Sequence, residues 1–236
     1  CALAAIVDPA PGAVDIARKA GVPRYDTLSA MLAQQRPDGV IIATPNSLHV
    51  DNALDCIAAG VPALVEKPAA HTLEAGARLL AAAERADARI LVGHHRAHSP
   101  LLVKARAIIQ QGLLGSLVGV MGSAVFYKPD HYFDEAPWRR QAGGGPILIN
   151  LIHEIGNLRS LCGEIVAVQA MPSNATRGFP VEDTVAMSLR FANGALGTFL
   201  LSDTAASARS WEQTSQENKS YSTYPDEDCY VIMGTR

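Results

Sequence analysis

The feature that most constrains the fold is a repeated alternation of apolar runs and helical patterns in the first part of the chain. Four apolar runs occur, at Ala2–Val7, Asp38–Thr44, Pro62–Val65 and Arg89–Gly93. Continuous apolar runs of this length are typical of strands buried on both faces of a parallel sheet. Amphipathic helical patterns separate them, with short connections. This order predicts βαβ units and a doubly wound parallel α/β sheet.

After Ser99 the pattern changes. One helical pattern follows. Farther on, Val185, Met187, Leu189 and Phe191 alternate with polar or small residues, before an Asn193–Gly194 pair that suits a tight hairpin. Runs of strands after a single helix indicate an α+β domain with a largely antiparallel open sheet. We therefore predict two domains, residues 1–98 and 99–236. The polar stretch Ala205–Asp228 reads as a long surface excursion.

Composition narrows the range of partners. The 236 residues are 48% hydrophobic and 18% charged, with a formal net charge of -3, which is typical of a soluble globular protein. This balance predicts neither a nucleic-acid partner nor a membrane partner. The four cysteines lack metal-ligand spacing, so we expect no metal site and a reducing, cytoplasmic setting.

Polar residues gather where the predicted parallel strands end. These are Asp8, the segment Thr44–Asn46, Lys67 and the segment His94–Arg96. In open α/β sheets ligands bind beyond the carboxyl ends of the strands. Four separate polar clusters on one sheet edge therefore predict a binding site there.

A second candidate site follows the glycine triplet Gly143–Gly145. Three glycines permit a sharp turn or a close backbone approach. Asn150 and His153 come next, and their spacing of three places both on one face of a helix. The pair is either a polar site on a cleft wall or part of a core helix whose histidine is hydrogen-bonded.

The ordered set of motifs resembles a known family. Asp8, Thr44-Pro45-Asn46, Glu66-Lys67-Pro68 and a glycine triplet before His153 resemble the glucose–fructose oxidoreductase / inositol dehydrogenase / rhizopine-catabolism family along essentially the whole chain. The resemblance implies a Rossmann-like domain followed by an α+β domain whose open sheet often mediates dimers or tetramers, so we expect a homodimer or homotetramer. It implies NAD(H) or NADP(H) as cofactor and a sugar or polyol as substrate. The reaction would be oxidation of a secondary hydroxyl or reduction of the matching carbonyl.

The resemblance assigns cofactor contacts to the first domain. Asp8 matches the acidic residue that hydrogen-bonds the adenosine ribose, and an acid there favours NAD over NADP; the alternative is a turn-initiating aspartate. Thr44, Pro45 and Asn46 match a loop beneath the cofactor, although Asn46 is equally well explained as a helix entry. Glu66 belongs to the same cofactor-binding set. His49 is expected to be helix surface.

Lys67 and His153 match the two catalytic positions. A lysine at the reacting hydroxyl lowers the cost of developing alkoxide charge; the alternative is a solvated surface lysine. In the family the bond between this lysine and Pro68 is typically cis. His153 matches the proposed acid–base partner, and its near-neutral pKa suits proton exchange.

The resemblance also implies roles for further residues, and some of these residues have a second interpretation. Trp138 and Arg139 match a pair near the nicotinamide or substrate, and Arg140 adds a contact to an anion or a hydroxyl. Arg96 matches an arginine at the last strand end, with a cofactor-binding or a structural role. Asn150 can hydrogen-bond a substrate hydroxyl. The substrate-contacting loops of the family fall on residues that also suit a surface loop: Tyr127, Lys128, Asp130 and Tyr132.

The chain departs from the family pattern near the histidine. Ile149 and Gly156 stand where many members have aspartate, so the carboxylate partner of His153 is missing from its usual position. Glu154 and Asp183 are the candidate substitutes. The Gly-rich loop that cradles the cofactor pyrophosphate is also absent, and we expect the native protein to extend beyond both ends of this sequence.

Three functions follow. The leading hypothesis is an NAD(P)-dependent dehydrogenase of a sugar, cyclitol or related polyol. The alternatives are a glycoside hydrolase of the same fold that uses NAD transiently, and a non-catalytic regulator that binds sugar or NAD. Retention of Lys67 and His153 favours an enzyme, whereas Ile149 motivates the regulator.

Overall fold

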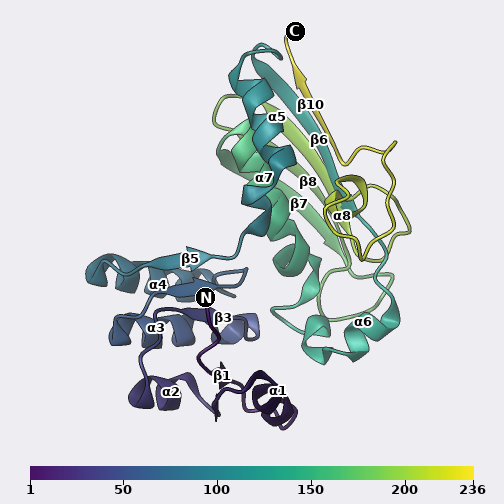
Figure 1. The fold of residues 1–236 in the computed structure, drawn as a ribbon. Coiled ribbons are helices and arrows are strands. Elements are labelled where there is room, and N and C mark those ends of the chain that lie inside the picture. The colour runs from purple at the N-terminus through teal and green to yellow at the C-terminus, as the bar shows by residue number, and fades with distance from the viewer. The chain divides into compact units, whose positions relative to one another are not determined.

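A computed structural model describes all residues from Cys1 to Arg236 and contains two compact units, Cys1–Gly93 and His94–Arg236 (Figure 1). Each unit has its own hydrophobic core.

The first unit alternates strands and helices as the sequence predicts. Its elements are β1 (Ile6–Val7), α1 (Ala13–Ala20), β2 (Arg24–Tyr25), α2 (Leu28–Gln34), β3 (Val40–Ile42), η1 (Asn46–Leu48), α3 (His49–Ala59), β4 (Ala63–Val65), α4 (Leu73–Ala86) and β5 (Ile90–Val92). All strand pairs are parallel, so the Rossmann-like fold class is confirmed. Local chemistry explains the helix ends, because Thr72 caps α4 and the left-handed Gly60 ends α3.

The parallel strands fall into two sheets. β1 pairs only with β2, and β3, β4 and β5 form a separate three-stranded sheet. Burial of these strands on both faces was predicted, and that prediction is wrong for the three-stranded sheet. Ile42 and Val65 are buried under the helices, whereas Ile41 and Leu91 on the opposite face are 72% and 69% exposed. Side chains alternate along a strand, so helices of this unit cover one face only.

The second unit is a mixed sheet with helices on one face. Its elements are η2 (His95–His98), α5 (Pro100–Gln110), β6 (Leu117–Val125), α6 (Asp130–Asp134), η3 (Pro137–Arg140), η4 (Ile147–Leu151), α7 (Ile152–Cys162), β7 (Ile165–Ser173), β8 (Thr184–Phe191), β9 (Leu196–Ser202), α8 (Trp211–Thr214) and β10 (Tyr230–Gly234). The strand order is β10-β6-β9-β8-β7. Three of its four strand pairs are antiparallel, and only β6 and β9 run parallel. The predicted α+β architecture is therefore confirmed.

The alternating pattern of β8 decides which face becomes the core. Val185, Leu189 and Phe191 are all buried, and the hairpin at Asn193–Gly194 joins β8 to β9. Helices α5 and α7 lie along this unit in Figure 1 and contribute Leu102 and Leu158, respectively, to the same core. The opposite face of the sheet stays open to solvent.

The segment between β9 and β10 differs from its prediction. It was predicted as a surface excursion, but it carries α8, where Trp211 is 9% exposed, and Ser210 just before α8 is fully buried. Trp211 is a member of the core of the second unit. Burial of a large aromatic side chain anchors this otherwise polar segment.

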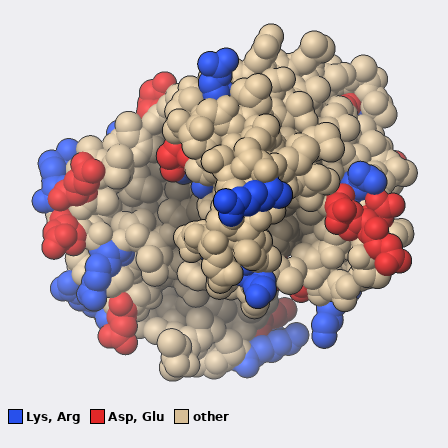
Figure 2. Space-filling view, turned by 90° about the horizontal axis from the view of Figure 1, so that it is seen from above, with Lys and Arg blue, Asp and Glu red and all other residues tan.

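On the surface that Figure 2 presents, basic and acidic side chains are interspersed and lie mostly toward the edges of the view. None of the helices combines the length and the apolar composition needed to cross a membrane.

Candidate functional site

In the first unit the carboxyl ends of three parallel strands lie side by side. The backbone N–H of Glu66 donates to the carbonyl of Ile42 at 2.9 Å, and that of Gly93 donates to Val65 at 2.8 Å. The segments that follow β3 and β4, Thr44–Asn46 and Glu66–Lys67, therefore leave the same edge of the sheet. This is the edge at which such sheets bind ligands.

The Lys67 segment has the conformation expected from the resemblance, because the Lys67–Pro68 peptide bond is cis. The Glu66 carboxylate accepts a hydrogen bond from the backbone N–H of Lys67 at 3.2 Å. A Cβ atom on Gly93 would lie 3.0 Å from that carboxylate, so the glycine lets Glu66 lie over the end of β5. The Glu66 carboxylate thus lies between the backbone of Lys67 and Gly93.

The position of His49 differs from the one predicted. It was predicted to lie on a helix surface, but it is 2% exposed. Its Nδ1 atom lies 2.8 Å from the Pro68 carbonyl oxygen, and its Nε2 atom lies 2.8 Å from that of Thr44. A neutral imidazole donates from one ring nitrogen and an imidazolium from both. The ring therefore joins the Thr44 segment to the Lys67 segment.

The sequence did carry a signal for this burial. His49 precedes the buried Ala53 by four positions and the buried Cys56 by seven, so the three share one face of α3. The first residue of this helix therefore belongs to its buried face.

Asp8 lies in the other sheet of this unit, directly after β1. Its carboxylate accepts the backbone N–H of Ala10 at 2.8 Å, and its carbonyl accepts from Arg24 at 2.9 Å. The side chain is exposed and begins a turn. A turn-closing carboxylate can still accept from ribose hydroxyls, so the two predicted roles are compatible.

These residues fit the ribose and amide groups of a nicotinamide dinucleotide. Hydroxyl, carboxamide and carboxylate oxygens from Thr44, Asn46, Glu66 and Asp8 stand at or near strand ends, where hydrogen bonds to sugar hydroxyls and a carboxamide are needed. Asn46 is 7% exposed, so its amide is held in place by its surroundings.

In the second unit the glycine triplet makes a close backbone approach. A Cβ atom on Gly144 would lie 2.5 Å from the carbonyl oxygen of Arg139, which no side chain could tolerate without movement. Gly145 has a φ of +78°, and the nearby Glu182 carboxylate accepts the N–H of Ile147 at 2.9 Å. The triplet therefore packs the Trp138–Arg140 turn against the start of the next helix.

Asn150 sits in a π-helical turn that leads into α7. The Lys128 ammonium donates to its side-chain oxygen at 2.5 Å. Lys128 is 4% exposed, and its ammonium lies 4.6 Å from the centroid of the Tyr132 ring. Single π-helical turns recur at functional sites. The sequence named Lys128 only as a loop residue, whereas the structure places it in direct contact with Asn150.

The remaining loop residues form a cationic–aromatic layer beside Lys128. Arg139 donates to the carbonyl of Tyr132 at 2.5 Å and lies over its ring at 3.8 Å, while Arg140 pairs with Asp134. Tyr127 is 53% exposed. Arg177, absent from the predicted site, joins the Lys128 carbonyl at 2.7 Å to the Asp203 carboxylate at 3.0 Å.

His153 is 6% exposed on α7 and faces two other histidines. Its ring centroid lies 4.9 Å from that of His95 and 6.5 Å from that of His94, in edge-on geometry. Of the two carboxylates considered as its partners, Asp183 accepts the backbone N–H groups of Thr176 and Arg177.

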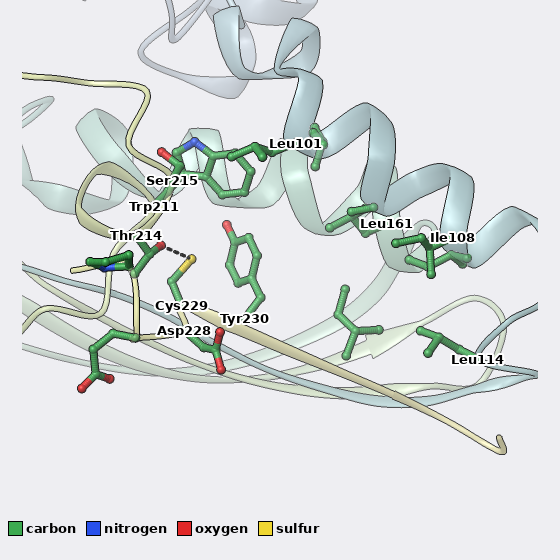
Figure 3. A pocket seen from close by; sticks show the side chains of 16 residues that line it. Leu101, Ile108, Leu114, Leu161, Trp211, Thr214, Ser215, Asp228, Cys229 and Tyr230 are labelled. Atoms are coloured by element: carbon green, nitrogen blue, oxygen red, sulfur yellow. Dashed lines mark hydrogen bonds between the residues drawn. The ribbon is translucent and has the colours of Figure 1, made fainter. Parts of the chain in front are cut away.

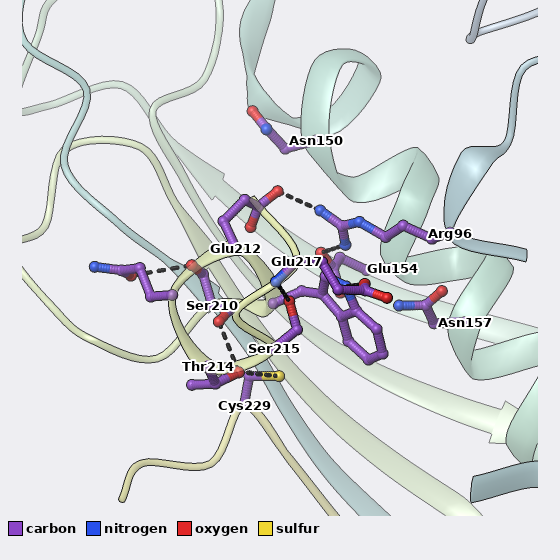
Figure 4. Close-up of polar contacts among 12 residues, drawn as sticks. Arg96, Asn150, Glu154, Asn157, Ser210, Glu212, Thr214, Ser215, Glu217 and Cys229 are labelled. Carbon is purple, nitrogen blue, oxygen red and sulfur yellow. Dashed lines mark hydrogen bonds and ion pairs between the residues drawn. The ribbon is translucent and has the colours of Figure 1, made fainter. Parts of the chain in front are cut away.

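The Glu154 side chain points into a buried cluster of charged residues (Figure 4). Its carboxylate pairs with Arg96 at 2.5 Å and accepts the Tyr230 hydroxyl, while Glu212 from α8 pairs with the other terminal nitrogen of Arg96. Burial raises the pKa of Glu154 to about 7, with Arg96 acting in the opposite direction. Of the two roles predicted for Arg96, this geometry supports the structural one.

A cavity of about 430 Å³ lies elsewhere in the second unit, between α5, α8 and β10. Figure 3 shows Leu101, Leu161, Trp211 and Cys229 around it. None of the predicted site residues lines it. Burial raises the pKa of the Cys229 thiol to about 11, so this thiol remains protonated and is a poor nucleophile.

Known families match nearly the whole chain. Residues 1–94 match a family described as "Oxidoreductase family, NAD-binding Rossmann fold", and residues 102–236 match the "GFO/IDH/MocA C-terminal domain". The chain is 34% identical over 166 residues to the rhizopine catabolism protein MocA of Rhizobium meliloti, covering 69% of this chain and 50% of that protein. It is 31% identical to the 1,5-anhydro-D-fructose reductase of Ensifer adhaerens, covering 69% and 49%. The chain thus spans about half the length of these relatives.

Solved structures agree with the fold. The WlbA dehydrogenase of Chromobacterium violaceum, in complex with NADH and UDP-GlcNAcA, superposes with a TM-score of 0.85 at 26% identity, covering 100% of this chain and 64% of that one. A levoglucosan dehydrogenase in complex with NADH and levoglucosan superposes with a TM-score of 0.80 at 25% identity, covering 99% and 62%. Both family matches and these structures lead to one conclusion: the chain belongs to the GFO/IDH/MocA family of oxidoreductases.

Proposed function

We propose that the protein is an NAD(P)-dependent dehydrogenase that oxidises a secondary hydroxyl of a sugar, cyclitol or related polyol, or reduces the matching carbonyl. The observation that carries this proposal is Lys67 at the carboxyl end of β4, in a segment that His49 ties to Thr44. A cation at a strand end of a dinucleotide-binding fold is suited to a hydroxyl that loses a proton during oxidation. The relatives named for sugar and anhydrosugar reactions support the same substrate class.

The polar side chains at the strand ends of the first unit are the proposed cofactor contacts. Asp8 would hold the adenosine ribose, Thr44, Pro45 and Asn46 would lie beneath the cofactor, and Glu66 would support the Lys67 segment. When bound, the nicotinamide accepts or donates the hydride. Trp138 and Arg139 are proposed to contact the nicotinamide or the substrate.

NAD is the proposed cofactor because a carboxylate at Asp8 repels a 2′-phosphate. One relative, the scyllo-inositol 2-dehydrogenase (NADP(+)) IolW of Bacillus subtilis, is named for NADP at 27% identity. Comparing the KM for NAD with that for NADP, in the wild type and in Asp8→Ala, tests the choice. Preference for NADP in the wild type would contradict it.

Lys67 and His153 are proposed to handle the hydroxyl proton. The Lys67 ammonium would stabilise negative charge on the substrate oxygen, and His153 would exchange the proton at working pH. Asn150, Tyr127 and Arg140 are proposed to hold other hydroxyls of the substrate. The contact of Lys128 with Asn150 would fix the direction of that carboxamide.

The test is NADH absorbance with the full chain, NAD and a panel of sugars, cyclitols and sugar acids. Lys67→Ala is compared with Lys19→Ala, an exposed lysine at the end of α1. Formation of NADH with one substrate class, abolished only in Lys67→Ala, would support the dehydrogenase. Cleavage of glycosides without net NADH would replace it with the hydrolase, and NAD binding without either reaction would replace it with the regulator.

Self-association is also proposed, as a homodimer or homotetramer. The open face of the five-stranded sheet carries exposed apolar side chains, among them Met121, Met171 and Leu200. Apolar patches of this kind commonly mark protein contacts. Light scattering on Met171→Lys and Leu200→Lys should show a smaller species than the wild type, and an unchanged mass would contradict this interface.

A further inference from the structure

Two contacts connect η2 and α7 through residues that are neighbours in sequence on both elements. The His95 ring lies 4.9 Å from the His153 ring, and the Arg96 guanidinium pairs with Glu154 at 2.5 Å. Residues 95 and 96 follow one another, as do residues 153 and 154. The ion pair therefore sets the spacing at which the two rings meet.

The ion pair is well placed to act as a rigid clamp. The side chains of Arg96 and Glu154 are only 5% and 1% exposed. The Tyr230 hydroxyl donates to the free side of the Glu154 carboxylate, and Glu212 holds the other terminal nitrogen of Arg96. Buried, charge-assisted and multiply bonded groups have few alternative positions. Because His95 and His153 are the sequence neighbours of Arg96 and Glu154, the ion pair also limits how far the two histidine rings can move apart.

Two ring contacts of His153 are to histidines. The adjacent Glu154 pairs with Arg96, and one carboxylate oxygen of Asp183 accepts two backbone N–H groups of a turn. A carboxylate beside a histidine favours the protonated ring, whereas a second titrating histidine disfavours it when charged. The sign of the influence of His95 on the pKa of His153 is therefore opposite to that of a carboxylate.

We propose that His95 is a positioning residue that tunes the proton affinity of His153, with the Arg96–Glu154 pair holding the two rings in contact. A proton on His95 repels a proton on His153, so the neutral, proton-accepting form of His153 extends to lower pH. This inference rests on the proposed role of His153 as the proton-exchanging group. The charged or titratable groups that face α7 around His153 in this unit come from several elements. They are His94 just before η2, His95 and Arg96 from η2, Glu154 on α7 itself, Glu212 from α8, Tyr230 from β10, and Lys128 through Asn150.

The expected size of the coupling follows from distance and solvent. His95 is exposed, so water screens its charge more than the buried position of His153 would suggest. Two charges about 5 Å apart in such surroundings change a pKa by roughly 0.5 to 1 unit. The two histidines are then expected to titrate in linked steps.

The test measures histidine pKa values by NMR in the full chain without cofactor, from the ring Cε1–H shifts of its seven histidines. His95→Phe keeps an aromatic edge against His153 and removes the charge. His98→Phe is the matched control, because His98 is exposed on the same short helix. We expect His95→Phe to raise the pKa of His153 by roughly 0.5 to 1 unit, and His98→Phe to leave it within 0.1 to 0.2, roughly the range set by distant charges.

The possible results distinguish the coupling of the two histidines from the proposed dehydrogenase activity. An unchanged His153 pKa in His95→Phe, or an equal change in His98→Phe, would overturn the proposal. Because this readout needs no turnover, it stands apart from the test of the dehydrogenase. A coupled titration with no activity on any substrate would remove the proposed function while retaining the tuning of His153. If activity is present, the acid limb of the pH–rate profile should move to higher pH in His95→Phe.

Discussion

The Nδ1 atom of His49 lies 2.8 Å from the carbonyl oxygen of Pro68, and the same ring reaches Thr44 on its other side. One buried side chain thus joins the two segments that leave β3 and β4. The Lys67 segment is therefore fixed both by β4, which precedes it, and by His49 at the start of α3.

Replacing His49 with leucine should loosen both segments. The carbonyls of Thr44 and Pro68 would lose their partner, and an unsatisfied buried acceptor costs about 1–3 kcal/mol. We expect a loss of about 2 kcal/mol in the free energy of unfolding by urea, together with lower affinity for NAD. Asp51→Ala on the same helix is the control, because its exposed ion pair with Arg78 contributes about 0–1 kcal/mol. Equal losses in both variants would contradict the proposed link.

Glu154 should make stability depend on pH. Burial raises its pKa in the folded protein from 4.5 to about 7, so the unfolded chain releases this proton at lower pH than the folded one. The raised pKa of Glu154 therefore adds to the free energy of unfolding. This added stability is fully present below pH 4.5 and is lost as pH rises through about 7. The difference is on the order of 3 kcal/mol.

Urea unfolding of the wild type and Glu154→Gln at several pH values between 5 and 8 measures this effect. Glutamine keeps an acceptor for Arg96 and removes the titration. We expect the fall in stability with rising pH to be weaker in Glu154→Gln. A wild type whose stability rises over this range, with Glu154→Gln unchanged in slope, would show that Glu154 is charged in the folded protein throughout.

Gly144 and Gly156 should respond oppositely to alanine. A Cβ atom at position 144 would lie 2.5 Å from the Arg139 carbonyl, whereas at position 156 it would meet nothing within 4 Å. We expect Gly144→Ala to destabilise the second unit and to weaken substrate binding through the Trp138–Arg140 turn. Gly156→Ala, inside α7, should stabilise by about 0.5–1 kcal/mol through helix propensity. Thermal melts of the two variants give the comparison, and a stable Gly144→Ala would refute the close approach.

Lys128 should matter for binding more than its place in a loop implies. Lys128→Met removes the hydrogen bond to Asn150 and leaves that carboxamide free to rotate. We expect kcat/KM for the polyol to fall about 10-fold, mainly through KM, since a hydrogen bond to a charged group contributes about 1.5–3 kcal/mol. Lys219→Met, in an exposed stretch, is the control. A change in kcat alone would argue that Lys128 does not act through substrate binding.

Much of the fold was predictable because it depends on local pattern. The order of strands and helices in the first unit, the hairpin at Asn193–Gly194 and the close turn at Gly144 all follow from residues near one another in sequence. The position of Lys67 at a strand end followed from the same pattern. His49 was misplaced although its helical spacing to Ala53 and Cys56 carried the signal.

The amino-acid sequence by itself determined which backbone segments become strands, where they end and where only glycine fits, since these depend on side-chain period and on φ/ψ limits. Tertiary structure alone decided which charges meet. Arg96 pairs with Glu154, 58 positions away, and with Glu212, 116 positions away, and no local pattern links them. The same holds for the sheet face that stays open at Ile41 and Leu91. Burial and ion pairing depend on what packs against a residue, and packing partners come from distant parts of the chain.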